Sequence, residues 1–340
     1  MNSDPSRVDT LHPALDQALA AFPAELAARA AAALQYLLRE RLAGGGKDAW
    51  TSSRLTGDGF PVEITFTTAD QRLRYTVEPA GPRAAPAERL ETAMQAVTDL
   101  GPAPISAETA AAFRSLQRPG GLFFGAYVGG RHSPADDQFK LYVETPFEAA
   151  TDGSLPAGPA GLLGDYPQPR RIDRPVHLRM IAWSPASDQW ELYYRVKDLA
   201  PHHLAAVLAP AGLAHLADEL EGYLRETYGH AFAERLPGES VGVSYTWQAG
   251  ETAHTATLFF FARTFWGGDA RIRREFGRWS TALGWDDREY QRVTAPLAGR
   301  RLWKTYHGIL GVTLLPTGEP ALSIGVRPPE TTLKTPAGKR

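Results

Sequence analysis

Hydrophobic and polar residues alternate with a period of two in paired segments of the chain, first at residues 62–66 and 72–77. In the first segment, valine, isoleucine and phenylalanine alternate with Glu63 and Thr65. Successive side chains of a β-strand point to opposite faces, so this alternation predicts two strands that are each buried on one face. The short connection between the two segments predicts that they form a hairpin.

The same paired pattern recurs along the chain at intervals of roughly 50–70 residues, which indicates an internal structural repeat. Further strand pairs are predicted at 122–128 and 138–144, 176–183 and 189–196, 240–247 and 254–263, and 303–314 and 320–327. Five consecutive hairpins supply ten antiparallel strands. Because an open sheet of this size has two unpaired edges, we expect it to close into a barrel.

Stretches with helical periodicity precede most of these hairpins. They lie at 12–22, 23–42, 86–100, 106–116, 201–209, 213–231, 268–283 and 286–297. The predicted fold class is therefore α+β, with helices covering the outside of a barrel. We expect one domain over residues 1–330 and a disordered Pro- and Lys-rich tail over residues 331–340.

In a barrel wrapped by helices, the outward strand face is apolar because helices pack on it, and the interior can be polar or aromatic. Every second residue of a strand points to the same face, and this alternation assigns a mixed set of charged, polar and aromatic side chains to the interior. This set includes Arg72, Arg74, Lys140, Tyr142, Gln189, Glu191, Tyr193, Arg195, Thr257, Phe259, Phe261, Arg263, Gly325 and Arg327. An open sheet with one wet face is the alternative, but it would expose four aromatic rings. Cations at one level and aromatic rings at another suit a ligand with an anionic head and a developing carbocation.

Composition excludes several classes of protein. The 340 residues carry a formal net charge of −2 and no long basic run, so nucleic acid is not an expected partner. Cysteine is absent, which excludes disulfides and thiolate metal sites. No signal-peptide pattern and no apolar run of membrane length appear, so we expect a cytoplasmic protein without a membrane partner. Monomer and homodimer both stay open.

Several segments resemble those of the dimethylallyltryptophan-synthase family of indole prenyltransferases. Residues 57–65, which contain Glu63, resemble one family segment, and residues 74–79 resemble its Arg-x-x-x-Glu-Pro strand. Residues 139–142 resemble its Lys-x-Tyr strand, and weaker similarity follows at 262–269 and 322–324. The resemblance implies the ABBA barrel, in which repeated α-β-β-α units enclose a reaction chamber.

The resemblance also implies an activity and residue roles. Such enzymes move an allylic prenyl group from its diphosphate to an aromatic ring without a metal or other cofactor. Glu63 would accept a hydrogen bond from the indole N–H, which makes the ring more nucleophilic. The remaining roles would be diphosphate binding by Arg74 and Lys140, and shielding of the cation by Tyr142, Tyr193 and Phe259. The implied acceptor is tryptophan, another indole compound or a tryptophan-containing peptide.

The later strands depart from the family pattern at the level of the diphosphate. The departures are Gln189, Glu191, Thr257 and Gly325. In one explanation the cradle has moved by one same-face step, to Arg195, Arg263 and Arg327. In the other, the donor differs from dimethylallyl diphosphate or the activity is lost. Gly325 and Thr257 would also enlarge the chamber for a longer prenyl chain or a peptide acceptor.

Two further questions stay open at the level of sequence. His132, in the glycine-rich connection 129–133, is the candidate base for the ring proton, and a solvated loop histidine is the alternative. For the function as a whole, the alternatives are a non-catalytic barrel that binds a small molecule or an isoprenoid, and a prenyltransferase that acts on phenols. His202 and His203 lack a third ligand at a suitable spacing, so a metal site is not expected there.

Overall fold

The structure is a computed structural model that describes residues 10–44, 46–118, 120–147, 155, 157–170, 172–232, 234–248, 255–300 and 304–330. The segment 331–340, for which disorder was predicted, lies outside the described residues.

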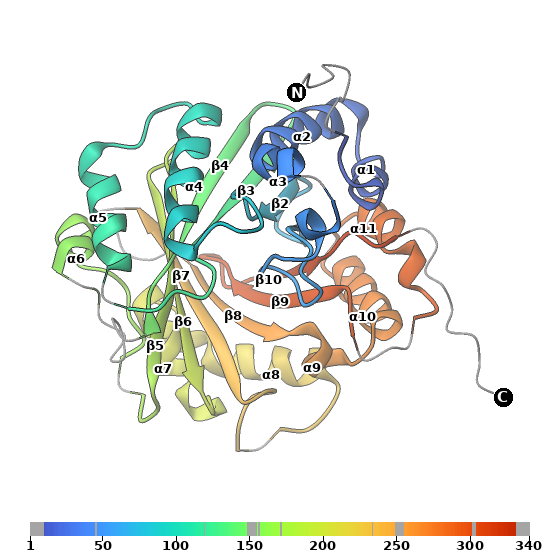
Figure 1. Cartoon of the computed structure of the whole chain (residues 1–340). Helices are drawn as coiled ribbons and strands as arrows, with labels where there is room; N and C mark the ends of the chain where they lie inside the picture. The colour runs from blue at the N-terminus through green and yellow to red at the C-terminus, as the bar shows by residue number, and fades with distance from the viewer. Residues whose placement is uncertain are drawn as a thin grey trace, which may run out of the picture.

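Ten antiparallel strands form a closed barrel in the order β1-β10-β9-β8-β7-β6-β5-β4-β3-β2 (Figure 1). The strands are β1 (Val62–Thr67), β2 (Leu73–Val77), β3 (Ala126–His132), β4 (Asp137–Glu144), β5 (Val176–Ser184), β6 (Gln189–Lys197), β7 (Ser240–Gln248), β8 (Thr255–Phe261), β9 (His307–Leu314) and β10 (Pro320–Val326). Each hairpin pairs with the next one. The predicted barrel of five hairpins is therefore confirmed.

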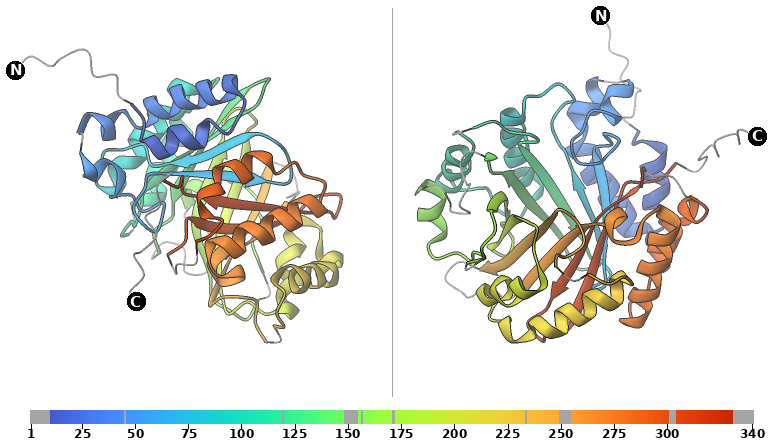
Figure 2. Two further views of the ribbon diagram at one scale, coloured as in Figure 1. Left: turned by 90° about the vertical axis from the view of Figure 1, so that its right-hand side faces the viewer. Right: turned by 90° about the horizontal axis from the view of Figure 1, so that it is seen from below.

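Helices surround the barrel, as Figure 2 shows in the view from below. They are α1 (Pro13–Leu19), α2 (Ala24–Leu37), α3 (Arg39–Gly44), α4 (Pro86–Leu100), α5 (Ala107–Gln117), α6 (Ala157–Leu163), α7 (Leu204–Leu208), α8 (Ala217–Tyr228), α9 (Ala262–Trp266), α10 (Asp269–Ala282) and α11 (Arg288–Val293). The ends of the strands thus differ: hairpin turns lie at one end of the barrel, and the connections through helices leave from the other, which we call the helical end.

The first and last strands close the barrel. Thr65 of β1 lies opposite Gly325 of β10, and Phe66 lies opposite Ile324. The neighbouring hairpin partner of Thr65 is Arg74 of β2. Residues from the two ends of the sequence therefore meet on one side of the interior.

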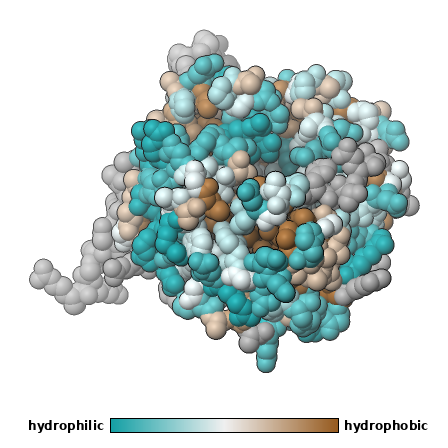
Figure 3. Space-filling model, turned by 180° about the vertical axis from the view of Figure 1, so that it is seen from behind, coloured by the Kyte–Doolittle hydropathy of each residue, from teal (hydrophilic) through white to brown (hydrophobic). Residues whose placement is uncertain are grey.

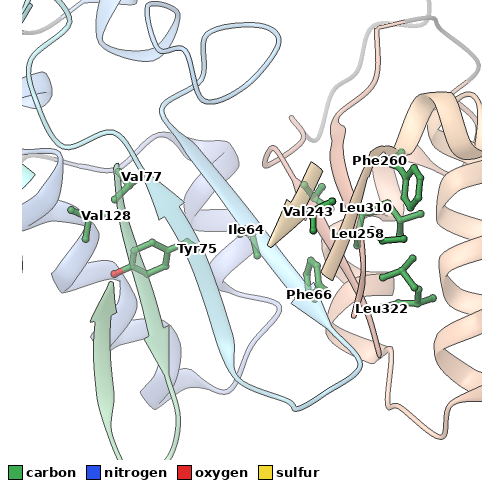
Figure 4. Packing of buried hydrophobic residues seen from close by; sticks show 14 of the residues in the cluster. Ile64, Phe66, Tyr75, Val77, Val128, Val243, Leu258, Phe260, Leu310 and Leu322 are labelled. Carbon is green, nitrogen blue, oxygen red and sulfur yellow. The ribbon is translucent and has the colours of Figure 1, made fainter. Parts of the chain in front are cut away.

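The outward faces of the strands pack against the helices and form the core with them. Residues on these outward faces are buried, whereas many of their inward-facing neighbours are only partly buried. Burial alternates along β1 and β2, with the apolar residues fully covered. Figure 4 shows side chains of Phe260, Leu310 and Leu322 pointing from the strands toward the neighbouring helix. The predicted division into an apolar outer face and a mixed inner face is what the structure contains.

Several strand boundaries differ from the prediction, and the differences at β3 and β8 change which residues belong to the strands. β3 begins at Ala126 and runs through Gly129 and Gly130 to His132, whereas the sequence had suggested that these glycines form a turn. The turn follows at Ser133, whose hydroxyl accepts from the amide of Asp136 at 3.0 Å. β8 ends at Phe261, and helix α9 begins at the next residue.

A buried ionic cluster joins the helical end of β2 to the surrounding elements. Glu78, directly after β2, has no solvent exposure and pairs with Arg41 of α3 and with Arg89 of α4, the latter at 3.0 Å. The hydroxyl of Ser53 also donates to Glu78, at 3.1 Å. Glu78 is therefore a structural residue that holds two helices and a loop against the barrel.

No described helix is both long enough and apolar enough to span a membrane. Seen from behind, the molecule presents hydrophobic residues near the centre of a face that is otherwise mostly hydrophilic (Figure 3).

Candidate active site

Glu63, the second residue of β1, points into the barrel. No hydrogen bond or ion pair to its carboxylate is present among the described residues, although the side chain is largely covered. The carboxylate lies against Gly308 of β9 and Gly325 of β10, where an added β-carbon would collide with its oxygens. The two glycines therefore make the space that this side chain fills.

Burial raises the pKa of Glu63 to about 7. Removal of a carboxylate from water penalises its charged form, and no nearby cation offsets this penalty. Near neutral pH the group is therefore divided between the charged carboxylate and the protonated acid. A buried carboxyl group with a pKa raised in this way is typical of a functional residue.

Three aromatic side chains form a continuous arc on the other side of the interior. The ring centroids of Tyr142 and Tyr193 are 6.1 Å apart, and those of Tyr193 and Phe259 are 5.7 Å apart. Glycines make room for this arc as they do for Glu63, since a β-carbon at Gly129 would lie 2.9 Å from the Tyr142 ring. The structure thus brings together the three residues predicted to shield a cation, on β4, β6 and β8.

Lys140 lies beside the arc and forms an ion pair with Glu191. Its ammonium nitrogen is 5.3 Å from the centroid of the Tyr142 ring and 6.0 Å from that of Tyr193. Ser244 of β7 donates to Glu191 at 2.6 Å. Although burial alone would raise it, the pKa of Glu191 is lowered, because Lys140, Ser244 and Tyr193 stabilise the carboxylate. Glu191 therefore neutralises the cation predicted to meet a diphosphate.

Arg74 is held by an acidic residue of its own hairpin. Its guanidinium donates through two nitrogens to Asp70 in the β1–β2 turn. Arg72 also lies 3.7 Å from this carboxylate. Burial raises the pKa of Asp70, but the hydrogen bonds and charge of Arg74 outweigh it and leave the pKa lowered.

The structure does not gather Arg195, Arg263 and Arg327 into a second cradle. Arg195 is exposed and lies opposite His177 near the helical end, away from Arg74. Arg263 is exposed on helix α9, because the strand that was expected to carry it ends before it. Arg327 is buried after β10 and pairs with Asp58 at 3.0 Å. Because Arg263 does not lie on the strand expected to carry it and Arg327 already has an acidic partner, the structure does not support a cradle shifted by one step, and that shift stays a prediction.

His132 is not a solvated loop residue and does not face the interior. It is fully buried on the outward side of β3, where Nδ1 contacts Asp137 at 2.7 Å and Nε2 contacts the Tyr75 hydroxyl at 3.2 Å. Burial lowers its pKa in spite of Asp137. The position of His132 beneath the helices fits a structural role and corrects the expectation of a catalytic base.

The departures from the family pattern have local explanations. The hydroxyls of Thr257 and Thr313 are 2.8 Å apart, so Thr257 is engaged by the neighbouring strand. The space beside Gly325 is filled by Glu63 and is therefore not extra room for a ligand. Gln189 lies at the beginning of β6, opposite Gln248.

Arg131 is an interior residue that the sequence interpretation missed. It lies opposite Arg74 of β2 and Gln138 of β4, on the inward side of β3. Because Gly129 and Gly130 were interpreted as a turn, Arg131 was not assigned to a strand or to the interior. The signal that could have revealed it is the Ser-Pro-Ala-Asp sequence at 133–136, which is a stronger turn pattern.

One group of side chains outside the barrel has the spacing of metal ligands. Ligand atoms of Asp173, His202 and His203 lie within 4.8 Å of one another. However, the Nδ1 atom of His203 accepts from the Ala200 amide at 3.1 Å, and its Nε2 atom is 2.6 Å from Asp173. Both ring nitrogens of His203 are thereby used to hold the chain at this corner, which argues against metal binding.

Comparison with solved structures shows the same architecture elsewhere. A 5-dimethylallyltryptophan synthase from Streptomyces coelicolor superposes with a TM-score of 0.72 and 16% sequence identity, over 94% of this chain and 96% of that one. The chain has the ABBA prenyltransferase fold. The crystal structure of the PriB binary complex with product diphosphate shares this ABBA fold at a TM-score of 0.71 and 18% identity, over 94% and 98% of the chains.

A more distant match to the ABBA fold is AnaPT from Neosartorya fischeri, with a TM-score of 0.63 and 12% identity over 93% of this chain and 91% of that one. The S. coelicolor synthase also matches in its complex with DMASPP and Trp, at a TM-score of 0.75 and 17% identity, over 96% of each chain. No family model and no curated protein sequence matches the chain.

Proposed function

We propose that this protein is an aromatic prenyltransferase that moves an allylic prenyl group from its diphosphate to an electron-rich ring, with indole as the preferred class of acceptor. In this reaction the C–O bond of the donor breaks, diphosphate leaves with the electron pair, and a ring carbon bonds to the allylic cation. Rearomatisation then transfers the ring proton to water or to the released diphosphate. The similar structures that contain DMASPP and Trp support this choice of donor and acceptor.

The observation that carries the proposal is the unpaired Glu63 carboxylate inside a barrel that also holds an arc of three aromatic rings. A carboxylate without a protein partner is free to accept the N–H of an indole. Electron density donated through that hydrogen bond makes the ring more nucleophilic toward the cation. The π faces of Tyr142, Tyr193 and Phe259 suit the stabilisation of the cation before it is captured.

Side-chain cations are proposed to replace a metal ion at the diphosphate. Arg74 lies on the inward face beside the hairpin turns, and guanidinium groups bind phosphate oxygens in a bidentate manner. Glu63 lies two residues nearer to the helical end, opposite Thr76. Donor and acceptor would therefore bind one above the other along the barrel axis.

The direct test is incubation of the protein with allylic diphosphates of several chain lengths and with tryptophan, indole peptides and phenols, with and without a chelator. Mass spectrometry of a prenylated product and measurement of released diphosphate give the readout. We expect transfer to an indole that continues in the presence of the chelator. Absence of product and of diphosphate release with every pair would reject the enzyme.

A second function is favoured by the Lys140–Glu191 pair, which removes one positive charge from the interior. A non-catalytic barrel that binds an isoprenoid or an aromatic molecule would have no need of that charge. Such a protein would bind a donor or acceptor in calorimetry but would release no diphosphate. Turnover with any donor rejects this alternative.

A further inference from the structure

Arg131 is a largely covered guanidinium without a protein partner of its own. Among the described residues it forms no hydrogen bond and no ion pair, although carboxylates are within electrostatic range. Arg74 is bound to Asp70 through two nitrogens, and Lys140 is bound to Glu191. Of these three interior cations, Arg131 alone keeps its donors available.

The surroundings of Arg131 carry an excess of positive charge. Arg74 and Arg72 are both within electrostatic range of it, and burial together with Arg74 lowers its pKa. The facing carboxylates are Asp70, which binds Arg74, and Asp136, which accepts from Ser133 and Gln138. Three guanidinium groups thus face two carboxylates, and an unpaired cation in such a place is costly unless an anion joins it.

The position of Arg131 matches the geometry of the chamber. It lies on the strand between Arg74 of β2 and Lys140 of β4, and it is within electrostatic range of Lys140 and of the Tyr142 hydroxyl. A diphosphate held here would lie beside the hairpin turns, with its allylic carbon directed toward the aromatic arc. Glu191 neutralises the positive charge of Lys140, and a cation on β3, the strand next to Lys140, would compensate for that loss.

We propose that Arg131 is the principal diphosphate-binding residue of this chamber and that it forms a two-strand anion site together with Arg74. The proposal rests on the proposed function, because the anion is taken to be the diphosphate of the prenyl donor. Guanidinium nitrogens match adjacent phosphate oxygens in a bidentate manner, which a lysine at this position would not reproduce.

The test is calorimetric binding of inorganic diphosphate to the full chain and to the variants Arg131→Met and Arg131→Lys at one ionic strength. Loss of a bidentate, charge-assisted contact predicts a dissociation constant about 10- to 100-fold weaker for Arg131→Met, with Arg131→Lys in between. Arg29→Met is the matched control, since Arg29 contacts the same hairpin from outside the barrel through Ser133 and Asp137. Its affinity should stay within about twofold.

Diphosphate that binds Arg131→Met as tightly as the wild type, or that fails to bind the wild type, overturns the proposal. If Arg131→Met does not fold, modification of the wild-type protein by phenylglyoxal gives the second measurement. Diphosphate should protect Arg131 from the reagent and leave exposed Arg195 reactive, as read by peptide mass spectrometry, and an unprotected Arg131 contradicts the proposal.

The two proposals fail separately. Diphosphate binding through Arg131 without any prenylated product would keep this anion site and reject the transferase. Product formation by Arg131→Met with an unchanged KM for the donor would keep the transferase and reject the assignment of Arg131.

Discussion

Glu63 occupies space that Gly308 and Gly325 leave open on the neighbouring strands. A residue of any size at position 325 would have to displace the carboxylate. Glycine at position 325 therefore allows Glu63 to keep its place in the proposed acceptor site. The glycine and the carboxylate are parts of one arrangement.

We expect Gly325→Ala to lower kcat/KM for indole prenylation by about 10- to 100-fold, because a displaced catalytic group costs rate even when the fold is kept. The measurement is steady-state kinetics alongside circular dichroism. Ser323→Ala, on the same face of β10, is the control and should retain activity within about threefold. Equal activity of Gly325→Ala and the wild type would show that Glu63 tolerates movement.

The pKa of Glu63, raised to about 7 by burial, predicts the pH dependence of catalysis. The carboxylate accepts an indole N–H more strongly than the protonated acid does, so kcat/KM should fall as pH decreases through about 7. Glu63→Gln should lower kcat at least about 10²-fold and remove this limb of the profile. A Glu63→Gln enzyme with the wild-type pH profile would exclude Glu63 as the titrating group.

The same shift predicts a change in stability of the opposite sign. In the folded state the Glu63 carboxyl stays protonated up to about pH 7, whereas in the unfolded chain it loses its proton near the ordinary glutamate pKa of 4.5. Stability is therefore lost as pH rises between these two values. Relative to the wild type, Glu63→Gln should gain up to about 3 kcal/mol in free energy of unfolding from pH 4 to pH 8. Urea titrations at several pH values measure this difference, and a constant difference would contradict it.

At the scale of elements, β4 and β6 are linked by the Lys140–Glu191 pair, whose side chains are 17% and 11% exposed. Lys140→Met would leave Glu191 unpaired and should lower the free energy of unfolding by about 3 kcal/mol. Lys140→Met combined with Glu191→Leu should recover most of that loss. A double-mutant cycle by urea unfolding gives the coupling, and additive effects would show that the pair is not a unit.

Strand β3 is an example of what the sequence could and could not predict about the fold and the site. The alternation of hydrophobic and polar residues predicted all five hairpins, because a half-buried strand keeps this period of two even where single residues depart from it. Gly129 and Gly130 broke that pattern, since their role depends on the rings of Tyr142 and Tyr75 that lie over them from adjacent strands. Contacts of this kind are set by register and cannot be seen along one strand, and Arg131 was missed with them.

The ion pair of Lys140 and Glu191 could not be predicted for a related reason. The two residues lie on strands that are not neighbours in the barrel order, and long side chains join them across the interior. Parity correctly placed both inside, together with Glu63, Arg74 and the aromatic arc. Partners and protonation depend on tertiary distances, which a strand pattern does not contain.

At the scale of the whole molecule, Glu78 ties α3, α4 and the 53–54 loop to the barrel. Glu78→Ala would leave Arg41 and Arg89 as buried cations without a carboxylate and should lower the free energy of unfolding by about 3–5 kcal/mol. Glu91→Ala, which breaks an exposed pair with Arg114, is the control and should cost about 0–1 kcal/mol. Equal losses for the two variants in chemical unfolding would show that Glu78 is not a structural centre.

The closure of β1 on β10 has a consequence for biosynthesis. Glu63 leaves the ribosome long before the glycines against which it lies, because those glycines belong to β9 and β10. Until then the nascent sheet has open edges, and pairing between such distant segments is slow and prone to aggregation. The barrel is therefore closed only after β10 has been made, and recombinant yield should depend on chaperones that shield the unfinished edges during synthesis.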